Sequence, residues 1–498
     1  MKKRKPILII ISLILITLGG FFIYNNYFNK AEEKELLEVS DDNTVYINML
    51  FNGFKPYRND DSNYFNLNLL KTDMDNIIEF QDFDGKIYIN NEKVNKSKPY
   101  KLSVKEISKD NNIQVTFIKN SGEKSEIYLR TLPDKYPEIS SSGESPYEGE
   151  YYLSTYYNTP QGNYIFKINN TGKLTFYKET TGFPFNFTKV VAGDKIRYCY
   201  LEESLIDTPL ENIGYRPCEL VVLDENYTHL KTIRAKGNGI LPDNAPLENH
   251  DYIYIDDNHY IVSSYVSYSE KNIPKEVYSG EGSINVVSAV IQEILDDEVV
   301  FQWQSSDHPE LYINSYENNE YNFAGKTLFD YCHLNSFTID PKDNNLVCSF
   351  RNLDSILKID RKSGDILWTL GGKGDEFNLD KKTEHFSRQH YVKVISENTL
   401  LFFDNESQGN PASALELSLD ENTKSITSYK RYSPIKRPSS AMGSAQLISR
   451  ENDVILINYG SISDHMPLFV EKDFKNNKEL FSFSYKDGLS AYRVQKYK

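Results

Sequence analysis

The feature that most constrains the fold of this chain is a short unit that recurs along it: a strand, a turn built on aspartate or asparagine, a second strand and often an aromatic residue. Clear copies lie at residues 164–176, 219–233, 356–368 and 415–429. Further alternating strands lie between them, at residues 258–263, 345–350, 398–403 and 453–458. A recurring four-strand unit is typical of β-propeller blades, which bury their faces only when the ring closes. With about 350 residues available, the length favours six blades over eight.

Composition predicts an all-β fold for the rest of the chain beyond its amino end. The 37 Tyr and 27 Phe residues, with frequent Val, Ile and Thr, favour pleated sheet over helix. Alternation at residues 113–117 and 126–129 predicts short strands, so we expect a small β-sandwich domain over residues 30–135. The serine-rich segment 140–146 has the composition of a linker and marks a boundary. We therefore expect the propeller domain over residues 136–498.

A basic and then apolar segment opens the chain. The basic run 2–5 precedes an apolar run of 18 residues from Ile7 to Tyr24, which is just long enough to cross a bilayer core of ~30 Å. The cations favour an amino end in the cytoplasm. A cleaved secretory signal is the alternative, but the run is long for one and no small-residue cleavage site follows. We expect residues 1–29 to form a cytoplasmic tip and a signal anchor, with the catalytic domain of this single-pass cell-membrane protein outside the cytoplasm.

Charge and cysteine content narrow the possible functions. A formal net charge of -15 would repel a phosphate backbone, so we expect no nucleic-acid partner. The four cysteines form no C-x-x-C motif, which excludes a zinc knuckle and a thioredoxin-like redox site. In an exported domain Cys199 could pair with Cys218, and Cys332 with Cys348; four buried thiols are the alternative.

Three histidines and one arginine stand out because each lies directly before or after a predicted strand. They are His250, His333, Arg351 and His390. Loops at one end of successive propeller blades converge on the axis, so residues that are far apart in sequence can meet there. Wide spacing between these four residues is therefore expected if they form one site.

The order of motifs between residues 332 and 405 carries a family resemblance. The motifs are Cys332-His333-Leu334-Asn335-Ser336, Arg351, the run from Ile359 to Trp368, and Gln389-His390. Together they resemble the core of the PAPS-independent arylsulfate sulfotransferases. The resemblance extends from about Tyr128 to the carboxyl end. It implies transfer of a sulfuryl group from a phenolic sulfate ester to another phenol, with no cofactor. The predicted membrane anchor departs from the simple export signal of that family.

The resemblance also implies a role for particular side chains. His390 would be the nucleophile that is transiently sulfated. His333, Asn335 and Arg351 would bind the sulfuryl oxygens, and His250 would complete the catalytic group. These residue types suit the chemistry: a neutral imidazole can attack sulfur, and the planar fork of arginine matches paired oxygens. Further imidazoles can move a proton to and from the phenol oxygen.

The implied partners are small molecules. An aryl sulfate would be the donor and a phenol the acceptor, and a hydroxyl residue that the family places late in the ring falls on Ser444, which is expected to bind substrate. The only membrane contact expected is through the amino-terminal helix, and a homodimer is left open.

Three other hypotheses remain open from the sequence. The run from Ile359 to Trp368 also resembles the tryptophan repeat of quinone-dependent propeller dehydrogenases, although it appears clearly only once and no adjacent cysteine pair exists. A non-catalytic extracellular propeller that binds a partner or glycan is the second. A zinc site built from the three histidines is the third, and the nearby cation of Arg351 argues against it.

Overall fold

The structure of the chain is a computed structural model. It describes residues 49–51, 57–58, 64–66, 77–80, 83–102, 112–130, 136–156, 162–204, 206, 210, 214–277, 282–316, 320–323, 326–380, 382–406, 411–461, 467–485 and 490–498. The predicted anchor at residues 1–29 lies outside these residues. Among those described, no helix is both long enough and apolar enough to cross a membrane. The chain divides into two compact units, Met1–Pro56 with Lys71–Arg130, and Tyr57–Leu70 with Thr131–Lys498.

The first unit holds two small antiparallel sheets among its described residues. One has the strand order β1-β4-β7, and the other contains β9, β8, β5 and β6 in that order. The bounds are β1 Met49–Phe51, β4 Ile77–Phe80, β5 Gly85–Ile89, β6 Glu92–Lys93, β7 Tyr100–Lys101, β8 Asn112–Lys119 and β9 Lys124–Arg130. Alternate residues of β5 and β8 face inward, so Ile87, Ile89, Val115 and Phe117 are buried.

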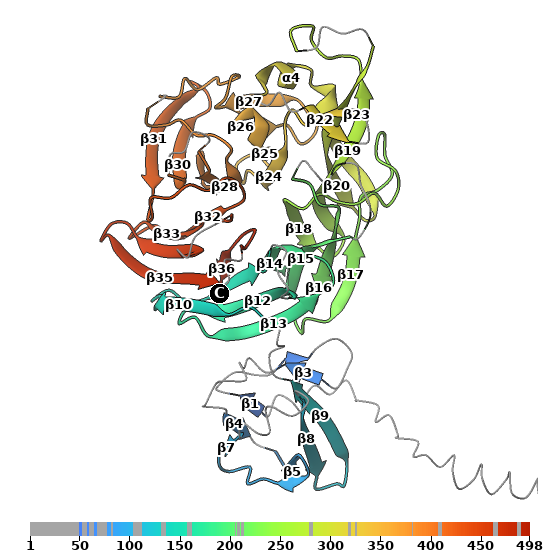
Figure 1. Cartoon of the computed structure of the whole chain (residues 1–498), viewed down its shortest axis with the longest axis vertical. Helices are drawn as coiled ribbons and strands as arrows, with labels where there is room; N and C mark the ends of the chain where they lie inside the picture. The colour runs from blue at the N-terminus through green and yellow to red at the C-terminus, as the bar shows by residue number, and fades with distance from the viewer. Residues whose placement is uncertain are drawn as a thin grey trace, which may run out of the picture. The chain divides into compact units, whose positions relative to one another are not determined.

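The second unit consists of small sheets arranged in a ring (Figure 1). In chain order its described sheets are β36-β11-β12-β13, β14-β15-β16-β17, β18-β19-β20-β21 with β23 and β22 added beside β20, β24-β25-β26-β27, β28-β29-β30-β31 and β32-β33-β34-β35-β10. Neighbouring strands are antiparallel except β20 and β23. A short hairpin of β2 (Tyr57–Arg58) and β3 (Tyr64–Asn66) also belongs to this unit.

In chain order, the strands up to the end of the third sheet are β10 Ile139–Gly143, β11 Glu150–Ser154, β12 Asn163–Asn169, β13 Leu174–Thr180, β14 Pro184–Ala192, β15 Lys195–Glu203, β16 Cys218–Leu223, β17 His229–Ile233, β18 Tyr252–Asp256, β19 His259–Glu270, β20 Ile284–Leu295, β21 Glu298–Gln304, β22 Glu320–Phe323 and β23 Lys326–Phe329. Of these, β10 belongs to the last sheet. The remaining strands are β24 Leu334–Ile339, β25 Leu346–Phe350, β26 Ser355–Ile359, β27 Ile366–Leu370, β28 His390–Ser396, β29 Thr399–Asp404, β30 Ser413–Asp420, β31 Ser425–Tyr432, β32 Ser444–Ser449, β33 Val454–Asn458, β34 Phe469–Asp473, β35 Lys478–Tyr485 and β36 Gln495–Tyr497. Helical pieces in the described residues are short: α4 Glu310–Asn314, η2 Ser305–Asp307 and η3 Arg351–Leu353.

Aspartate and asparagine side chains form the turns that the recurring unit predicts. Between β26 and β27, the backbone N–H groups of Lys362 and Ser363 each donate to Oδ1 of Asp360 at 2.8 Å. Between β12 and β13, the N–H of Lys173 donates to Oδ1 of Asn169 at 2.9 Å. A short polar side chain that accepts from the following backbone is what allows a tight reversal here.

The first strand of each sheet lies nearest the axis, and these inner strands contact one another in sequence. β14 contacts β18, β18 contacts β24, β24 contacts β28, β28 contacts β32, and β32 contacts β36. The second unit therefore has a β-propeller-like fold, and the all-β prediction is confirmed. The amino ends of the inner strands share one end of the axis, because each of these strands starts its sheet in the same direction.

Both ends of the second unit close the ring. Strand β36 pairs with β11, with Glu150 opposite Tyr497, and so the carboxyl end supplies the inner strand of the first sheet. Strand β10 pairs with β35, with Ile139 opposite Tyr485, and so an early segment supplies the outer strand of the last sheet. The carboxyl-terminal strand β36 therefore completes the first sheet, and the early strand β10 completes the last sheet.

Aromatic side chains fill the space between sheets. Tyr151 on β11 stacks on Phe481 of β35 with ring centroids 4.9 Å apart, and Phe469 of β34 stacks on Phe483 at 5.2 Å. All four are nearly or fully buried. The four cysteines are buried free thiols, which agrees with the second of the two alternatives that the sequence left open.

Candidate active site

Three of the predicted histidines lie at the amino ends of inner strands. His250 comes shortly before β18, His333 directly before β24, and His390 is the first residue of β28. Because β18, β24 and β28 follow one another around the axis, their amino ends bring the three imidazoles into one region. All three side chains are buried, between 3% and 6% exposed.

The rings of His250 and His333 are in contact. Their centroids lie 5.0 Å apart and their planes are close to perpendicular. Tyr265 on β19 packs near both rings, at 6.0 Å from His250 and 5.7 Å from His333. His390 lies close enough that positive charge on either of the other two imidazoles lowers its pKa. The structure therefore brings the three histidines together.

A carboxylate holds the Nδ1 atom of each of the first two histidines. Nδ1 of His333 lies 2.6 Å from Oδ2 of Asp330. Nδ1 of His250 is hydrogen-bonded to Oε2 of Glu248, which also accepts the backbone N–H of His250 at 2.6 Å. A carboxylate at Nδ1 fixes the ring and stabilises the imidazolium when Nε2 takes a proton. These two histidines therefore have the surroundings of general acid–base groups.

His390 is held by neutral groups instead. Its Nδ1 lies 2.7 Å from Oδ1 of Asn405 and 2.9 Å from the carbonyl oxygen of Arg388. The backbone N–H of Met442 points at Nε2, at 3.3 Å. Two acceptors at Nδ1 and a donor at Nε2 assign the proton to Nδ1, which leaves the lone pair on Nε2. The Nδ2 group of Asn405 is fixed in turn by the carbonyl oxygens of Met442 and Ser439, at 3.0 and 3.2 Å.

Burial favours the neutral forms of His390, His250 and Glu248. Burial lowers the pKa of His390 well below its usual value, and the nearby guanidinium of Arg351 adds to the effect. Burial also lowers the pKa of His250. The carboxyl group of Glu248 responds in the opposite direction: burial raises its pKa to about 8, although hydrogen bonds from neighbouring donors oppose the shift. His390 is thus an uncharged imidazole at neutral pH.

Arg351 lies beside the cluster, at the start of η3. Its backbone N–H donates to the carbonyl oxygen of His333 at 2.9 Å, which joins the loop after β25 to the residue before β24. Its Nη1 donates to Oδ1 of Asn352 at 2.9 Å, and its side chain is partly exposed. A guanidinium in this position can present paired donors to the oxygens of an anion next to His390.

Asn335 and Ser444 are buried, and both are used in internal contacts. Nδ2 of Asn335 donates to the carbonyl oxygen of Gln389 at 2.7 Å, directly before His390. Within the described part of the chain its Oδ1 has no hydrogen-bond partner. The hydroxyl of Ser444 donates to the carbonyl oxygen of Val494 at 3.0 Å and accepts the N–H of Val494 at 3.2 Å. The predicted contacts of both residues with substrate stay predictions.

The backbone around the imidazoles adopts a conformation that residues other than glycine rarely take. The φ angles are +53° at His333, +55° at Arg388, +57° at Tyr391 and +63° at Met442. Each such residue costs on the order of 1–3 kcal/mol, and such residues gather at functional sites. Gly443 follows at φ +100°, where an added Cβ would lie 2.4 Å from the ring of Phe403.

Arg493 is a buried arginine that was not predicted from the sequence, and it contacts residues next to the site. Nη1 of Arg493 lies 2.8 Å from Oδ1 of Asp251, and Nη2 donates to the carbonyl oxygen of Asn335 at 2.7 Å. Its guanidinium also lies over the rings of Tyr391 and Tyr492, at 4.6 and 5.4 Å. Arg493 thereby links the carboxyl-terminal segment to the residues next to His250 and His390.

Other groups that hold the imidazoles were also missed. Glu248 precedes His250 by two residues and Asp330 precedes His333 by three, and an acid so close before a candidate histidine was an available signal. Asn405 lies 15 residues after His390 and was not singled out from the sequence. Its role depends on the pairing of β28 with β29, which local sequence does not reveal.

The zinc hypothesis gains no support from this geometry. Over the residues for which the structure gives positions, no group of three or more His, Cys, Asp or Glu side chains is arranged to hold a metal ion.

Comparison with known proteins adds one family match. The family model described as arylsulfotransferase (ASST) matches residues 207–480, more than half of the chain. No curated protein matches the chain. Among solved structures, the periplasmic gluconolactonase PpgL from Pseudomonas aeruginosa is 10% identical, with a TM-score of 0.34 over 78% of this chain and 95% of its own. A luciferin-regenerating enzyme is 10% identical, with a TM-score of 0.32 over 72% of this chain and 98% of its own.

Proposed function

Because the chain belongs to the arylsulfotransferase family, we propose that it moves a sulfuryl group from a phenolic sulfate ester to another phenol, through a sulfohistidine at His390 and without a nucleotide donor. The observation that carries the proposal is that Nδ1 of His390 is hydrogen-bonded to neutral groups, the amide of Asn405 and the carbonyl oxygen of Arg388. Burial and the nearby guanidinium of Arg351 keep the ring uncharged, and Asn405 at Nδ1 leaves a lone pair on Nε2 beside the two further imidazoles. That is the state a nitrogen nucleophile requires.

In the first half-reaction, Nε2 of His390 attacks sulfur while the bond between sulfur and the phenolic oxygen breaks. The electron pair of the broken bond leaves with the phenolic oxygen, which takes a proton from the imidazolium of His333, with the neutral ring of His250 beside it. The sulfuryl oxygens carry negative charge throughout, and Arg351 offsets it. The N–H of Met442, which donates to Nε2 in the resting site, becomes available to one of those oxygens.

In the second half-reaction, the acceptor phenol gives its proton to the imidazole that was left neutral. The phenolic oxygen then attacks sulfur as the bond from sulfur to Nε2 breaks, which restores His390. The carboxylate of Asp330 supports this proton cycle because it stabilises an imidazolium at His333. Asn335 is proposed to act next to the nucleophile through Gln389, and Ser444 is proposed to lie at the acceptor side.

We extend the proposal to architecture and location. The sheets of the second unit are proposed to be the blades of a six-bladed propeller, supported by their strand order around the ring. Residues 1–29 are proposed to anchor the chain with the catalytic domain outside the cytoplasm, supported by the basic run that precedes the apolar one. A small aryl sulfate and a phenol are the proposed partners.

The test is transfer from 4-nitrophenyl sulfate to phenol, followed by release of 4-nitrophenol. We expect His390→Ala to lower the rate by about 10³-fold or more, because the nucleophile is gone while binding groups remain. His229→Ala, which removes an exposed histidine from β17, is the matched control and should keep the full rate. Wild-type protein mixed with donor alone should gain the mass of one sulfuryl group on the peptide that contains His390. Full activity of His390→Ala would eliminate the covalent mechanism.

A further inference from the structure

A cavity lies on the axis toward the carboxyl ends of the inner strands, whereas the histidines lie at their amino ends. Its volume is about 530 Å³, and residues of β14, β18, β24, β28, β32 and β36 line it. Asp251 and Tyr391, which directly follow His250 and His390, are part of its wall. The volume falls within the range of small-molecule sites, about 300–1,000 Å³.

Lys393 on β28 brings a positive charge to this cavity. Its Nζ lies 3.6 Å from Oδ2 of Asp251 and 3.5 Å from the carbonyl oxygen of Phe337, and it stands over the ring of Tyr391 at 4.6 Å. These are long contacts for an ammonium group. The side chain is 28% exposed, so it is accessible to a molecule in the cavity. Burial lowers the pKa of Lys393, which means that its charge lacks solvation that an anion would replace.

The nearest carboxylate is already neutralised by another cation. Oδ1 of Asp251 lies 2.8 Å from Nη1 of Arg493, closer than either oxygen lies to Lys393. Its further donors, at 3.0 to 3.1 Å, are Nδ2 of Asn186 and the backbone N–H groups of Tyr252 and Phe337. Asp251 and Arg493 form a paired unit, and the charge of Lys393 is left in excess at the cavity wall.

Lys189 also lines the cavity, but its Nζ donates to the carbonyl oxygen of Lys498. Polar side chains of the lining are those of Asn186, Thr188, Thr338, Gln446 and Gln495, and the remainder is largely aromatic and aliphatic. Four tyrosines contribute to it: Tyr252, Tyr254, Tyr391 and Tyr497. Val190, Ile339 and Leu447 add apolar surface. A largely apolar pocket with one available cation is complementary to a molecule that has a flat apolar body and one acidic group.

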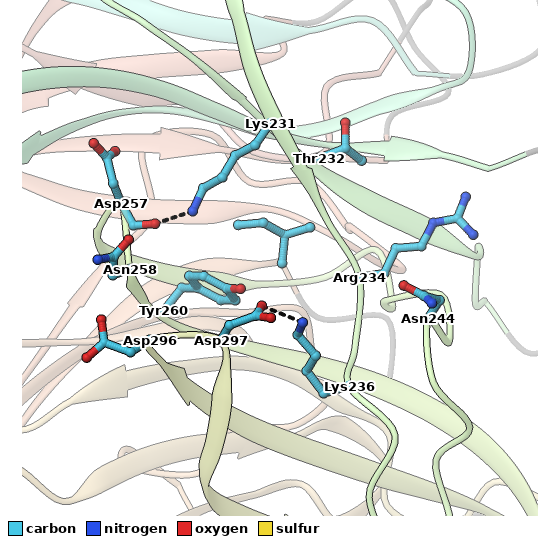
Figure 2. Close-up of a pocket in the computed structure, with 11 residues that line it drawn as sticks. Lys231, Thr232, Arg234, Lys236, Asn244, Asp257, Asn258, Tyr260, Asp296 and Asp297 are labelled. Carbon is cyan, nitrogen blue, oxygen red and sulfur yellow. Dashed lines mark hydrogen bonds and ion pairs between the residues drawn. The ribbon is translucent and has the colours of Figure 1, made fainter.

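A groove elsewhere on the second unit shows what a cavity without an available cation looks like. It encloses about 480 Å³ between the β17 segment and the turns after β18 and β20 (Figure 2). Lys231 donates to the carbonyl oxygen of Asp257, and Lys236 pairs with Asp297. Arg234 pairs with Glu219 at 2.9 Å. Because each of its cations has a close oxygen partner, this groove offers no comparable anchor for an anion.

From the cavity, the excess charge and the apolar lining together, we propose that the axial cavity is a second ligand site, which binds an aromatic carboxylate or sulfonate with its acid group on Lys393. The site is separate from the imidazole cluster, since Asp251, Tyr391 and Arg493 stand between them. It does not depend on sulfuryl transfer, so either proposal can fail without the other.

Naphthalene-2-carboxylate, which has no sulfuryl group to transfer, is a suitable probe in titration calorimetry with the purified chain. We expect saturable binding at one site in the wild type. Lys393→Met keeps the aliphatic stem and removes the charge, and it should weaken binding about tenfold or more, the effect of a lost charge-assisted hydrogen bond. Lys430→Met, which removes an exposed lysine paired with Asp453, is the matched control and should leave affinity unchanged.

Two further variants test where the probe binds. Arg351→Ala should leave its affinity unchanged, because Arg351 belongs to the imidazole cluster. Leu447→Trp should weaken binding with Lys393 intact, because the larger ring occupies the cavity; circular dichroism confirms that each variant is folded. The neutral naphthalene-2-carboxamide should bind wild type and Lys393→Met equally weakly. No saturable binding to the wild type, equal carboxylate affinity in Lys393→Met, or loss of affinity in Arg351→Ala would each overturn the proposal.

Discussion

At the scale of single residues, a neutral amide and two carboxylates divide the three imidazoles into two kinds. Asp330 and Glu248 hydrogen-bond to Nδ1 of His333 and His250, while the amide of Asn405 hydrogen-bonds to Nδ1 of His390, which burial keeps uncharged. In the proposed mechanism the group at Nδ1 therefore distinguishes the acid–base imidazole from the nucleophile. The choice of partner, rather than the histidine itself, assigns the role.

Replacement of that neutral partner by an acid gives a prediction about pH. In the wild type the pKa of His390 is lowered, so the imidazole stays neutral well below pH 6.5. In Asn405→Asp a carboxylate next to Nδ1 favours the imidazolium and raises that pKa. Transfer should therefore slow near neutral pH and recover as the pH rises above the new value. Rates of 4-nitrophenol release between pH 5 and 9 check this.

Asn422→Asp, which places the same change in an exposed turn after β30, is the control for this experiment. Its pH profile should match that of the wild type. An unchanged profile for a folded Asn405→Asp variant would mean that protonation of His390 does not limit the reaction.

A site residue could be predicted only where it forms a recognisable motif with its neighbours in the sequence. His333, Asn335 and Arg351 follow one another within twenty residues in a recognisable order, and His390 comes after glutamine in the same order. Asn405 and Arg493 carry no such local signal. Asn405 meets His390 through strand pairing, and Arg493 meets Asn335 across 158 positions of the chain. Contacts of that kind exist only once the fold brings distant strands together.

At the scale of elements, the strands with their turns were the most predictable part. The predicted units at residues 356–368 and 415–429 became the pairs β26 with β27 and β30 with β31, because the side chain that forms the turn is adjacent to both strands. The pairing of β10 with β35 could not be read from sequence. Ser140, in the segment expected to be a linker, lies opposite Ser484, and nothing in its local composition indicates a strand.

Ser444 permits a prediction at this scale because its hydroxyl joins β32 to the segment that leads into β36. It both donates to and accepts from the backbone of Val494 in a buried position. Ser444→Ala should lower the free energy of unfolding by about 1–3 kcal/mol, since two buried backbone groups lose a partner. Urea denaturation measures this loss.

Ser428→Ala, on the exposed face of β31, is the control and should change stability little. A variant Ser444→Ala with wild-type stability and a raised KM would instead assign the hydroxyl to substrate binding.

At the scale of the whole molecule, a buried ion pair fastens the two ends of the ring. Nζ of Lys496 on β36 lies 2.9 Å from Oε2 of Glu471 on β34, and both side chains are at most 2% exposed. Tyr151 on β11 donates to the same carboxylate at 2.7 Å, and Ser145 also donates to it. One carboxylate thus connects the first sheet, the last sheet and the closing strand.

Lys496→Met should destabilise the chain by about 3–5 kcal/mol, because it leaves the carboxylate of Glu471 buried without its cation. The double variant Lys496→Met with Glu471→Gln should recover part of that loss, since the buried charge is then removed as well. Thermal unfolding of both variants, with the exposed Lys430→Met as control, makes the comparison. Equal stability of Lys496→Met and wild type would show that the pair does not fasten the ring.

Ring closure by the last strand has a consequence for the timing of synthesis. Strand β36 and Arg493, which precedes it, leave the ribosome after every other part of the propeller-like unit. A nascent chain can fold its earlier sheets in order, but the guanidinium that binds Asp251 and Asn335 is absent until the segment before β36 has been made. The residues next to His250 and His390 lack that contact in a half-made ring, so the proposed chemistry at His390 requires the closed ring.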